Sequence, residues 1–174
     1  MRKKIYCKWT ILLPLILTII AILFFIPYKQ ALVFQYQNTE EVLVYLPFSK
    51  DYEFKIKYTH SIHLSDVVEY FTINDKSQMK LYELEYEDFA IGMPENASGD
   101  EIFEQKNGKY YIKNMNREFD SIDMRIGQVK ANHTLIYKNG EFPLKKVIKP
   151  GTWVRMKVEK INLFEQMKGV SLLE

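Results

Sequence analysis

The stretch that decides the fold is residues 53–73, EFKIKYTHSIHLSDVVEYFTI. From Phe54 to Tyr58 apolar and charged side chains alternate, and a second run, from Val67 to Ile73, places its apolar side chains mainly on one face. A period of two is typical of a β-strand with one buried face. The stretch therefore predicts two neighbouring strands that turn their apolar faces toward a common core.

The same alternation recurs in residues 121–126 and 153–158, so strands are expected well beyond the opening pair. Asn107-Gly108 and Asn139-Gly140 lie between strand-like stretches. An Asn-Gly pair supplies the positive φ angles of a type I′ turn, so each pair predicts a hairpin. We expect an all-β fold: a single antiparallel β-sandwich or a partly open barrel behind one N-terminal helix.

The N-terminal helix is predicted from the apolar run of residues 9–27, in which no charged residue lies between Thr10 and Ile26. A run of this length rises about 1.5 Å per residue and just reaches a bilayer core of roughly 30 Å. The run ends in the bulky sequence Phe24-Phe25-Ile26-Pro27-Tyr28, which lacks the small residues of a signal-peptide cleavage site. We therefore expect an uncleaved transmembrane signal anchor.

Four basic residues precede this run: Arg2, Lys3, Lys4 and Lys8. Basic residues stay on the cytoplasmic side of a membrane, so the rest of the chain is expected outside the cytoplasm. The prediction divides the chain into a cytoplasmic basic tip (residues 1–8), a transmembrane anchor (9–27) and an extracytoplasmic β-domain (28–174). The expected location is the cell membrane, with a single pass.

The composition of residues 28–174 excludes several classes of function. The chain has 24 basic and 22 acidic residues, and with four basic residues in the tip this domain keeps 20 basic against 22 acidic ones. It therefore has no basic excess for binding nucleic acid. The sole cysteine is Cys7, so no disulfide or thiolate metal site forms in the domain. We expect neither a metal nor a cofactor.

The best chemical signal is the pair His60 and Glu69, because both are expected on core-facing positions of the two strands. A four-residue loop, 63–66, places His60 directly opposite Glu69. A shorter loop places Glu69 opposite Ile56 and leaves the carboxylate without a cross-strand partner. Burying an unpaired charge costs on the order of several kcal/mol, so we predict the first register.

Three roles are open for this pair. The two side chains could form a structural hydrogen bond that stabilises the hairpin. They could line a small polar pocket for a ligand or a partner's side chain, or His60 could form a catalytic dyad with Ser61. The dyad is disfavoured because Ser61 follows His60 directly and projects from the opposite face of a strand. A metal site with His63 is disfavoured by the odd spacing of the two histidines.

Several motifs, in order along the chain, resemble the family catalogued as domain of unknown function 1850 (DUF1850). The first is residues 58–71, with His60-Ser61 and then Glu69. Residues 89–94 resemble the family's glycine-rich corner, which ends in proline. Residues 124–127, MRIG, resemble its leucine-arginine-valine-glycine strand end, and residues 133–135 with Gly140 resemble its histidine-leucine hairpin. The resemblance spans about residues 40–158.

The resemblance implies a partner more than a reaction. Members of this family typically accompany the fused permease of TAXI-type TRAP transporters, beside an extracytoplasmic solute-binding protein. The implied role is a non-enzymatic, single-span accessory subunit next to both proteins. The candidate ligand- or partner-binding residues, which include the corner at Gly92 and Pro94, are His60, Ser61, Glu69, Gly92, Pro94, Arg125 and His133.

Two rival functions are carried alongside. One is a membrane-tethered extracytoplasmic module for ligand binding or sensing, in which His60, Glu69 and an arginine line the pocket. The other, weaker rival is an extracytoplasmic hydrolase. It is disfavoured because the sequence has no nucleophile elbow, no metal motif and no paired-carboxylate spacing.

Overall fold

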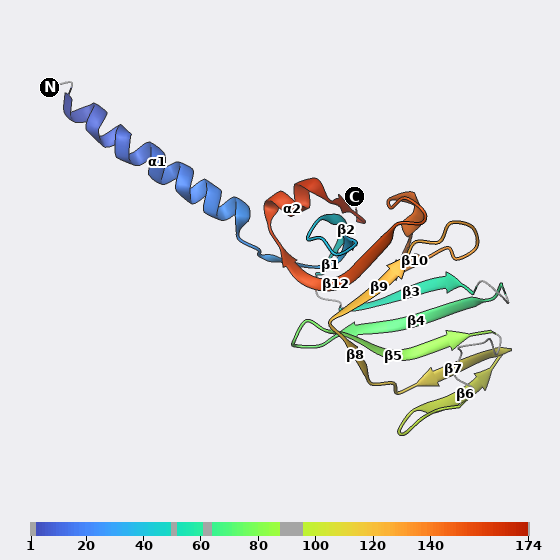
Figure 1. Ribbon diagram of the computed structural model, residues 1–174. Helices are drawn as coiled ribbons and strands as arrows, with labels where there is room; N and C mark the ends of the chain where they lie inside the picture. The colour runs from blue at the N-terminus through green and yellow to red at the C-terminus, as the bar shows by residue number, and fades with distance from the viewer. Residues whose placement is uncertain (1–2, 50–51, 61–63, 88–95, 174) are drawn as a thin grey trace.

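The computed structural model describes residues 3–49, 52–60, 64–87 and 96–173, and Figure 1 shows a long N-terminal helix followed by a body of β-strands. The helix, α1, is Lys3–Phe25. The strands form two sheets, so the chain is mainly β and sandwich-like, as the alternating pattern predicted. Two short helical segments, η1 (Leu144–Lys146) and α2 (Leu163–Lys168), flank the last long strand.

The first sheet, in the part of the chain that the structure describes, has five strands. Their spatial order is β13 (Val170–Ser171), β2 (Val42–Pro47), β1 (Lys29–Tyr36), β12 (Trp153–Ile161) and β9 (Ser121–Arg125). β13 pairs with β2 in parallel, whereas the other pairs are antiparallel. The prediction of a purely antiparallel sandwich is therefore wrong at this one edge.

The second sheet has eight strands within the described ranges. Their order is β11 (Gly140–Pro143), β10 (Thr134–Tyr137), β3 (Glu53–Thr59), β4 (Asp66–Ile73), β5 (Met79–Tyr86), β7 (Lys109–Lys113) and β6 (Ile102–Lys106), with β8 (Arg117–Phe119) pairing β5 off this path. Every pair in this sheet is antiparallel.

The core lies between the two sheets, because the inward positions of both are apolar. Leu32 and Phe34 of β1 are fully buried and belong to the same cluster as Phe54 and Phe71 of the second sheet. The rings of Phe54 and Phe71 stack with their centroids 5.2 Å apart, as directly opposite residues of β3 and β4. Burial of such aromatic and aliphatic side chains is the main stabilising term for a chain without a disulfide.

Both predicted hairpins form, but only one turns at the expected residues. Asn107 and Gly108 have φ angles of 55° and 77° and connect β6 to β7. In the other hairpin Gly140 already pairs with Tyr137, and the positive φ of 54° falls on Lys138. The turn thus lies one residue earlier than the Asn-Gly pair predicted.

The predicted N-terminal helix is confirmed, but its crossing of a membrane is not. Within the described residues, no helix combines the length and hydropathy that a crossing requires. The first turns of α1 contain Lys3, Lys4 and Lys8, and the uncharged remainder from Trp9 to Phe25 extends about 25 Å, against a bilayer core of roughly 30 Å.

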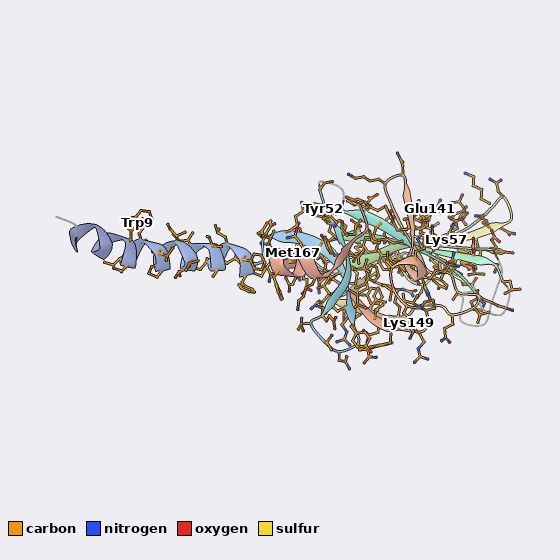
Figure 2. The ribbon with its side chains drawn as sticks, turned by 90° about the horizontal axis from the view of Figure 1, so that it is seen from above. Trp9, Tyr52, Lys57, Glu141, Lys149 and Met167 are labelled. Atoms are coloured by element: carbon orange, nitrogen blue, oxygen red, sulfur yellow. The ribbon has the colours of Figure 1, made fainter. Side chains whose placement is uncertain are left out.

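α1 extends away from the β-domain in both views (Figures 1 and 2) and meets it at α2. The rings of Phe24 and Phe25 lie 6.0 and 5.6 Å from the ring of Phe164 in α2. α2 begins with a capping box, in which the Asn162 side chain accepts from the backbone of Glu165 and the Glu165 carboxylate accepts from the backbone of Asn162. This reciprocal pair fixes where the helix starts.

Replacing Leu32 by alanine should remove about 2–5 kcal/mol from the free energy of unfolding, because Leu32 is completely buried between the sheets. Leu173→Ala is the matched control, since Leu173 is 51% exposed and should change stability by less than about 0.5 kcal/mol. Denaturant unfolding of the full chain in detergent measures both. Equal losses for the two variants would contradict this placement of the core.

Candidate functional site

The hairpin of β3 and β4 does not adopt the register that the sequence analysis predicted. Ile56 lies opposite Glu69, and Tyr58 lies opposite Val67. His60 lies just beyond β3, where its backbone N–H donates to the carbonyl of Ser65 at 2.8 Å. The predicted His60–Glu69 pair is therefore wrong, and the shorter loop that was rejected is the one that forms.

The loop closes in a way that the chain pattern does not reveal. Leu64 adopts a φ of 58°, and its N–H donates to the carbonyl of His60 at 3.0 Å. At the last strand pair, the Thr59 hydroxyl donates to the Asp66 carboxylate at 3.0 Å. These two hydrogen bonds stabilise the observed register, in which Leu64 adopts the left-handed conformation that a non-glycine residue adopts only at a cost.

Glu69 does face the core, and its partner is Tyr58. The Tyr58 hydroxyl donates a hydrogen bond to the Glu69 carboxylate. The two residues are diagonal neighbours on one face, because Tyr58 pairs with Val67 and Glu69 pairs with Ile56. Diagonal neighbours in a sheet lie within reach of aromatic and long side chains. The requirement that an inward carboxylate be satisfied was correct, but its partner is a tyrosine and not the histidine.

Burial sets the protonation of this pair. Burial raises the pKa of the Glu69 carboxyl, and the hydrogen bond from Tyr58 partly offsets that rise. Burial, and then the charge of Glu69, raise the pKa of Tyr58, so its hydroxyl keeps its proton and remains a donor. The pair can therefore hold or release a proton at Glu69, whereas Tyr58 only donates.

His133 joins the same cluster from the start of β10. Its ring lies 5.7 Å from the ring of Tyr58, and its Nδ1 accepts from the backbone N–H of Gly127 at 3.3 Å. Burial lowers the pKa of His133, which favours the neutral ring with its proton on Nε2. Gly127 has no room for a side chain, because a Cβ there would lie 1.6 Å from the carbonyl oxygen of Ala131.

A cavity of about 380 Å³ borders Glu69 between the two sheets. Its walls combine the Glu69 carboxyl with apolar side chains and the end of β9. The lining residues are Glu69, Phe71, Leu81, Phe119, Ser121, Ile122 and Asp123. The Asp123 carboxylate forms an ion pair with Arg155, which donates to both of its oxygens at 2.8 and 3.0 Å. Such a space suits a small apolar group that carries one hydrogen-bonding atom.

The structure separates the remaining predicted residues from this cluster. Arg125 is exposed at the end of β9 and lines a different pocket, near Trp153. Ser61, Gly92 and Pro94 lie outside the described residues, as does His63. The cluster thus unites Glu69 and His133 through Tyr58. Sequence reasoning missed Tyr58 because it considered only directly opposite partners.

No group of three or more histidine, cysteine, aspartate or glutamate side chains that could hold a metal ion occurs among the described residues. Glu69 and His133 meet through a tyrosine, which is not a common ligand of zinc. The expectation of a site without a metal stays a prediction.

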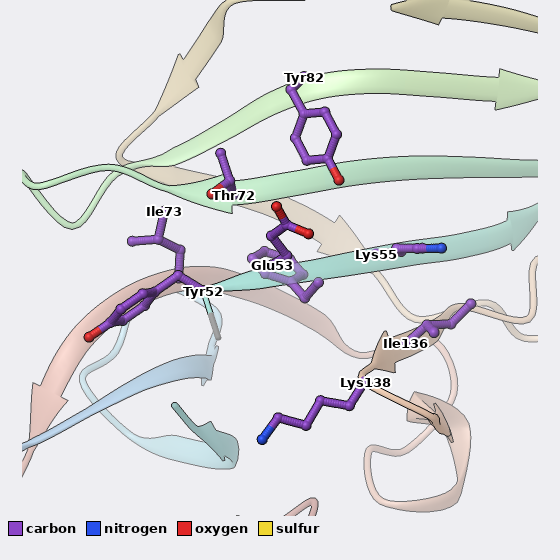
Figure 3. A pocket seen from close by; sticks show the side chains of 9 residues that line it. Tyr52, Glu53, Lys55, Thr72, Ile73, Tyr82, Ile136 and Lys138 are labelled. Carbon is purple, nitrogen blue, oxygen red and sulfur yellow. The ribbon is translucent and has the colours of Figure 1, made fainter. Parts of the chain in front are cut away.

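A second pocket, of about 630 Å³, lies on the outer face of the second sheet (Figure 3). Outward side chains of β3 to β5 and β10 line it, among them Glu53 and Lys55, together with Lys138 just after β10. Burial and the nearby Glu53 raise the pKa of Tyr82, and Figure 3 shows the two side chains approaching each other. Sequence reasoning missed this pocket because outward polar positions of a strand are usually only solvated.

The cluster of Tyr58, Glu69 and His133 lies within a segment that matches a known protein family. The family described as a domain of unknown function (DUF1850) matches residues 54–144, just over half of the chain. The chain belongs to this family. No curated protein matches the chain, and no solved structure matches it. The matched segment contains Tyr58, Glu69, Gly127 and His133, so the whole cluster falls inside the family's domain.

Replacing Tyr58 by phenylalanine should lower the free energy of unfolding by about 1–3 kcal/mol, because the Glu69 carboxyl then stays buried without its donor. The matched control is Tyr52→Phe, since Tyr52 is 41% exposed and should shift stability by less than about 0.5 kcal/mol. Denaturant unfolding at neutral pH compares the two. An unchanged stability in Tyr58→Phe would show that the bond contributes nothing.

Glu69 and His133 should give stability opposite dependences on pH. The raised pKa of Glu69 means that the folded state holds this proton more tightly, so its contribution is lost as pH rises above the usual value of 4.5 through the raised pKa. The lowered pKa of His133 means that stability falls as pH drops below the usual value of 6.5.

Melting temperatures between about pH 4 and pH 8 test this prediction. Glu69→Gln, which can still accept from Tyr58, should abolish the decline toward high pH. His133→Asn, which can still accept from Gly127, should abolish the decline toward low pH. Identical pH profiles for wild type and both variants would contradict the assigned protonation states.

Proposed function

We propose that this protein is a non-enzymatic, membrane-attached accessory subunit, and that its partner is the permease of a TAXI-type TRAP transporter together with the associated solute-binding protein. The observation that carries the proposal is α1. This helix exposes large apolar side chains along its length, while the β-domain completes a core of its own. The choice of partner rests on the proteins that members of this family typically accompany.

α1 needs an apolar covering that the described part of the chain does not supply. Trp9 is 63% exposed, Leu23 is 66% exposed, and every turn between them exposes at least one large apolar side chain. A helix that is apolar all round belongs in a protein core or in lipid. Each Å² of apolar surface left in water costs about 25 cal/mol, so lipid or the helices of a permease would cover α1 favourably.

Charge favours one orientation for this attachment. The basic residues Arg2, Lys3, Lys4 and Lys8 precede the apolar part of α1, and basic flanks favour the cytoplasmic side. In the proposal, the β-domain therefore faces the extracytoplasmic side, where a solute-binding protein would meet it. The small net charge of this domain suits a protein partner better than nucleic acid.

The polar cluster supports a structural or binding role. Glu69 is hydrogen-bonded to Tyr58, and His133 accepts from a backbone N–H, so each group has a partner that holds it in place. Ser61 is outside the described residues, and His60 does not lie opposite Glu69. We therefore assign no catalytic step to these residues.

A membrane-attached ligand-binding module is the second candidate function. The cavity beside Glu69 favours it, since a carboxyl in a largely apolar wall can recognise one polar atom of a small ligand. This candidate and the accessory role are compatible, because a subunit can bind a solute and a protein at different faces.

Affinity purification of the tagged full chain from its own membranes in a mild detergent should retain the permease. A variant with Leu15→Lys and Ile19→Lys should lose both the permease and the membrane fraction, because charge on an apolar helix opposes burial in lipid. Lys160→Gln on β12, which leaves α1 unchanged, is the control. Recovery of folded wild-type protein without the permease would refute the proposed partner.

Cysteine labelling of intact cells tests the proposed orientation separately. Cys7 is the only cysteine of the chain and precedes the apolar run. In a Cys7→Ser background, Lys106→Cys at the exposed end of β6 should react with a membrane-impermeant maleimide. Native Cys7 should react only after permeabilisation. Labelling of Lys106→Cys only in permeabilised cells would place the β-domain in the cytoplasm and contradict the proposal.

A further inference from the structure

A third pocket lies at the far end of the first sheet, where β1 ends and β12 begins. Its volume is about 700 Å³, within the roughly 300–1,000 Å³ that ligand sites usually occupy. The walls come from the end of β1 with Gln37, from Leu43, Arg125, Gln128 and Val170, and from residues 147–153, which lead into β12. None of these residues lies in the Glu69 cluster.

Backbone hydrogen bonds tie the two loops of this pocket together. The N–H of Ile126 donates to the carbonyl of Thr152 at 2.9 Å, and the N–H of Gly151 donates to the carbonyl of Ile126 at 2.7 Å. Gly151 has a φ of +86°, and a Cβ there would lie 2.5 Å from the side-chain nitrogen of Gln128. Glycine therefore lets the Gln128 amide lie against this loop.

The pocket carries positive charge without a compensating carboxylate in its wall. Arg125 and Lys149 line it, and no aspartate or glutamate is among the described residues that do so. The nearest acidic residue along β9, Asp123, is held by Arg155 through two hydrogen bonds. Asp123 is therefore already neutralised by another arginine and leaves Arg125 available.

Aromatic side chains accompany these cations. Trp153 lies directly opposite Arg125 in the pairing of β12 with β9, so the two share a face. The Arg155 guanidinium lies 5.6 Å from the Trp153 ring and supports the ring from the neighbouring position. Tyr36, at the end of β1, also borders the pocket, but it pairs with Val154 and so lies on the opposite face from Trp153.

We propose that this pocket binds a small organic carboxylate with an aromatic or other apolar body. The Arg125 guanidinium recognises the carboxylate through paired N–H donors, and Lys149 adds a second positive charge. The Trp153 ring, on the same face as Arg125, covers the apolar body. This inference does not depend on the transporter partner, because it concerns a face that α1 does not touch.

Trp153 itself reports on the pocket, since the chain has only one other tryptophan, Trp9. In a Trp9→Phe background, phenylacetate should change the Trp153 fluorescence saturably at millimolar concentrations or below. Its neutral counterpart, 2-phenylethanol, and inorganic phosphate should each act far more weakly. The full chain in detergent is used throughout.

Arg125→Gln and Lys149→Gln should each raise the dissociation constant for phenylacetate about tenfold or more, the loss expected when one charged hydrogen-bond donor is removed. Arg117→Gln is the matched control, because Arg117 lies on β8 and pairs with Glu101 at 3.1 Å. Arg125→Lys, which keeps the charge, should retain part of the affinity. Unchanged melting temperatures would show that each variant folds.

Three outcomes would overturn the proposal. Equal binding of phenylacetate and 2-phenylethanol would mean that the charge recognises nothing, and so would equal binding by folded Arg125→Gln and wild type. The third is the absence of any saturable change with phenylacetate, hexanoate and succinate. Neither result would bear on the copurification of the permease, so the two proposals fail separately.

Discussion

The satisfaction of one inward carboxylate, Glu69, constrains much of the second sheet. A carboxyl on the core face needs a hydrogen-bond donor, and the Tyr58 hydroxyl supplies it across the diagonal of the hairpin. Because the hydroxyl must reach Glu69, the ring of Tyr58 lies where His133 can pack against it. His133 in turn accepts from Gly127. A single polar requirement thus links β3, β4 and the start of β10 to the residues after β9, which belongs to the other sheet.

The sequence pattern predicts which residues share a face better than which residues touch. Alternation correctly assigned Tyr58 and Glu69 to the core, because the side-chain period of a strand depends only on the local chain. Register depends instead on how the loop closes. The bonds from Leu64 to His60 and from Thr59 to Asp66 stabilise the observed closure, and neither is visible in a hydrophobic pattern. Both registers keep the same faces inward, so the pattern alone could not separate them.

The segment that matches the family does not form the complete sandwich, so the cluster around Glu69 also depends on strands outside that segment. Residues 54–144 include most of the second sheet and β9, but not β1 or β12. The inner face of the matched segment is covered by residues such as Phe34 and Met156, which lie outside it. A one-sided sheet cannot bury its apolar face alone. In this chain β1 and β12 therefore supply the second layer that covers the inner face of the matched segment.

The path of β1 also separates the pockets along the molecule. β1 begins at Lys29, shortly after α1, and its eight residues end at Tyr36 on the wall of the Arg125 pocket. At about 3.3 Å per residue, this strand places that pocket roughly 25 Å from the end of α1. The outer pocket of Figure 3 lies nearer to α1, since Gln30 reaches Ser77 on the turn that follows Ile73. If α1 is held in or against a membrane, lipid and permease helices would meet the near end. The cationic pocket at the far end would remain accessible to a solute and to a soluble partner. One small domain can therefore contact the membrane at one end and bind a ligand at the other.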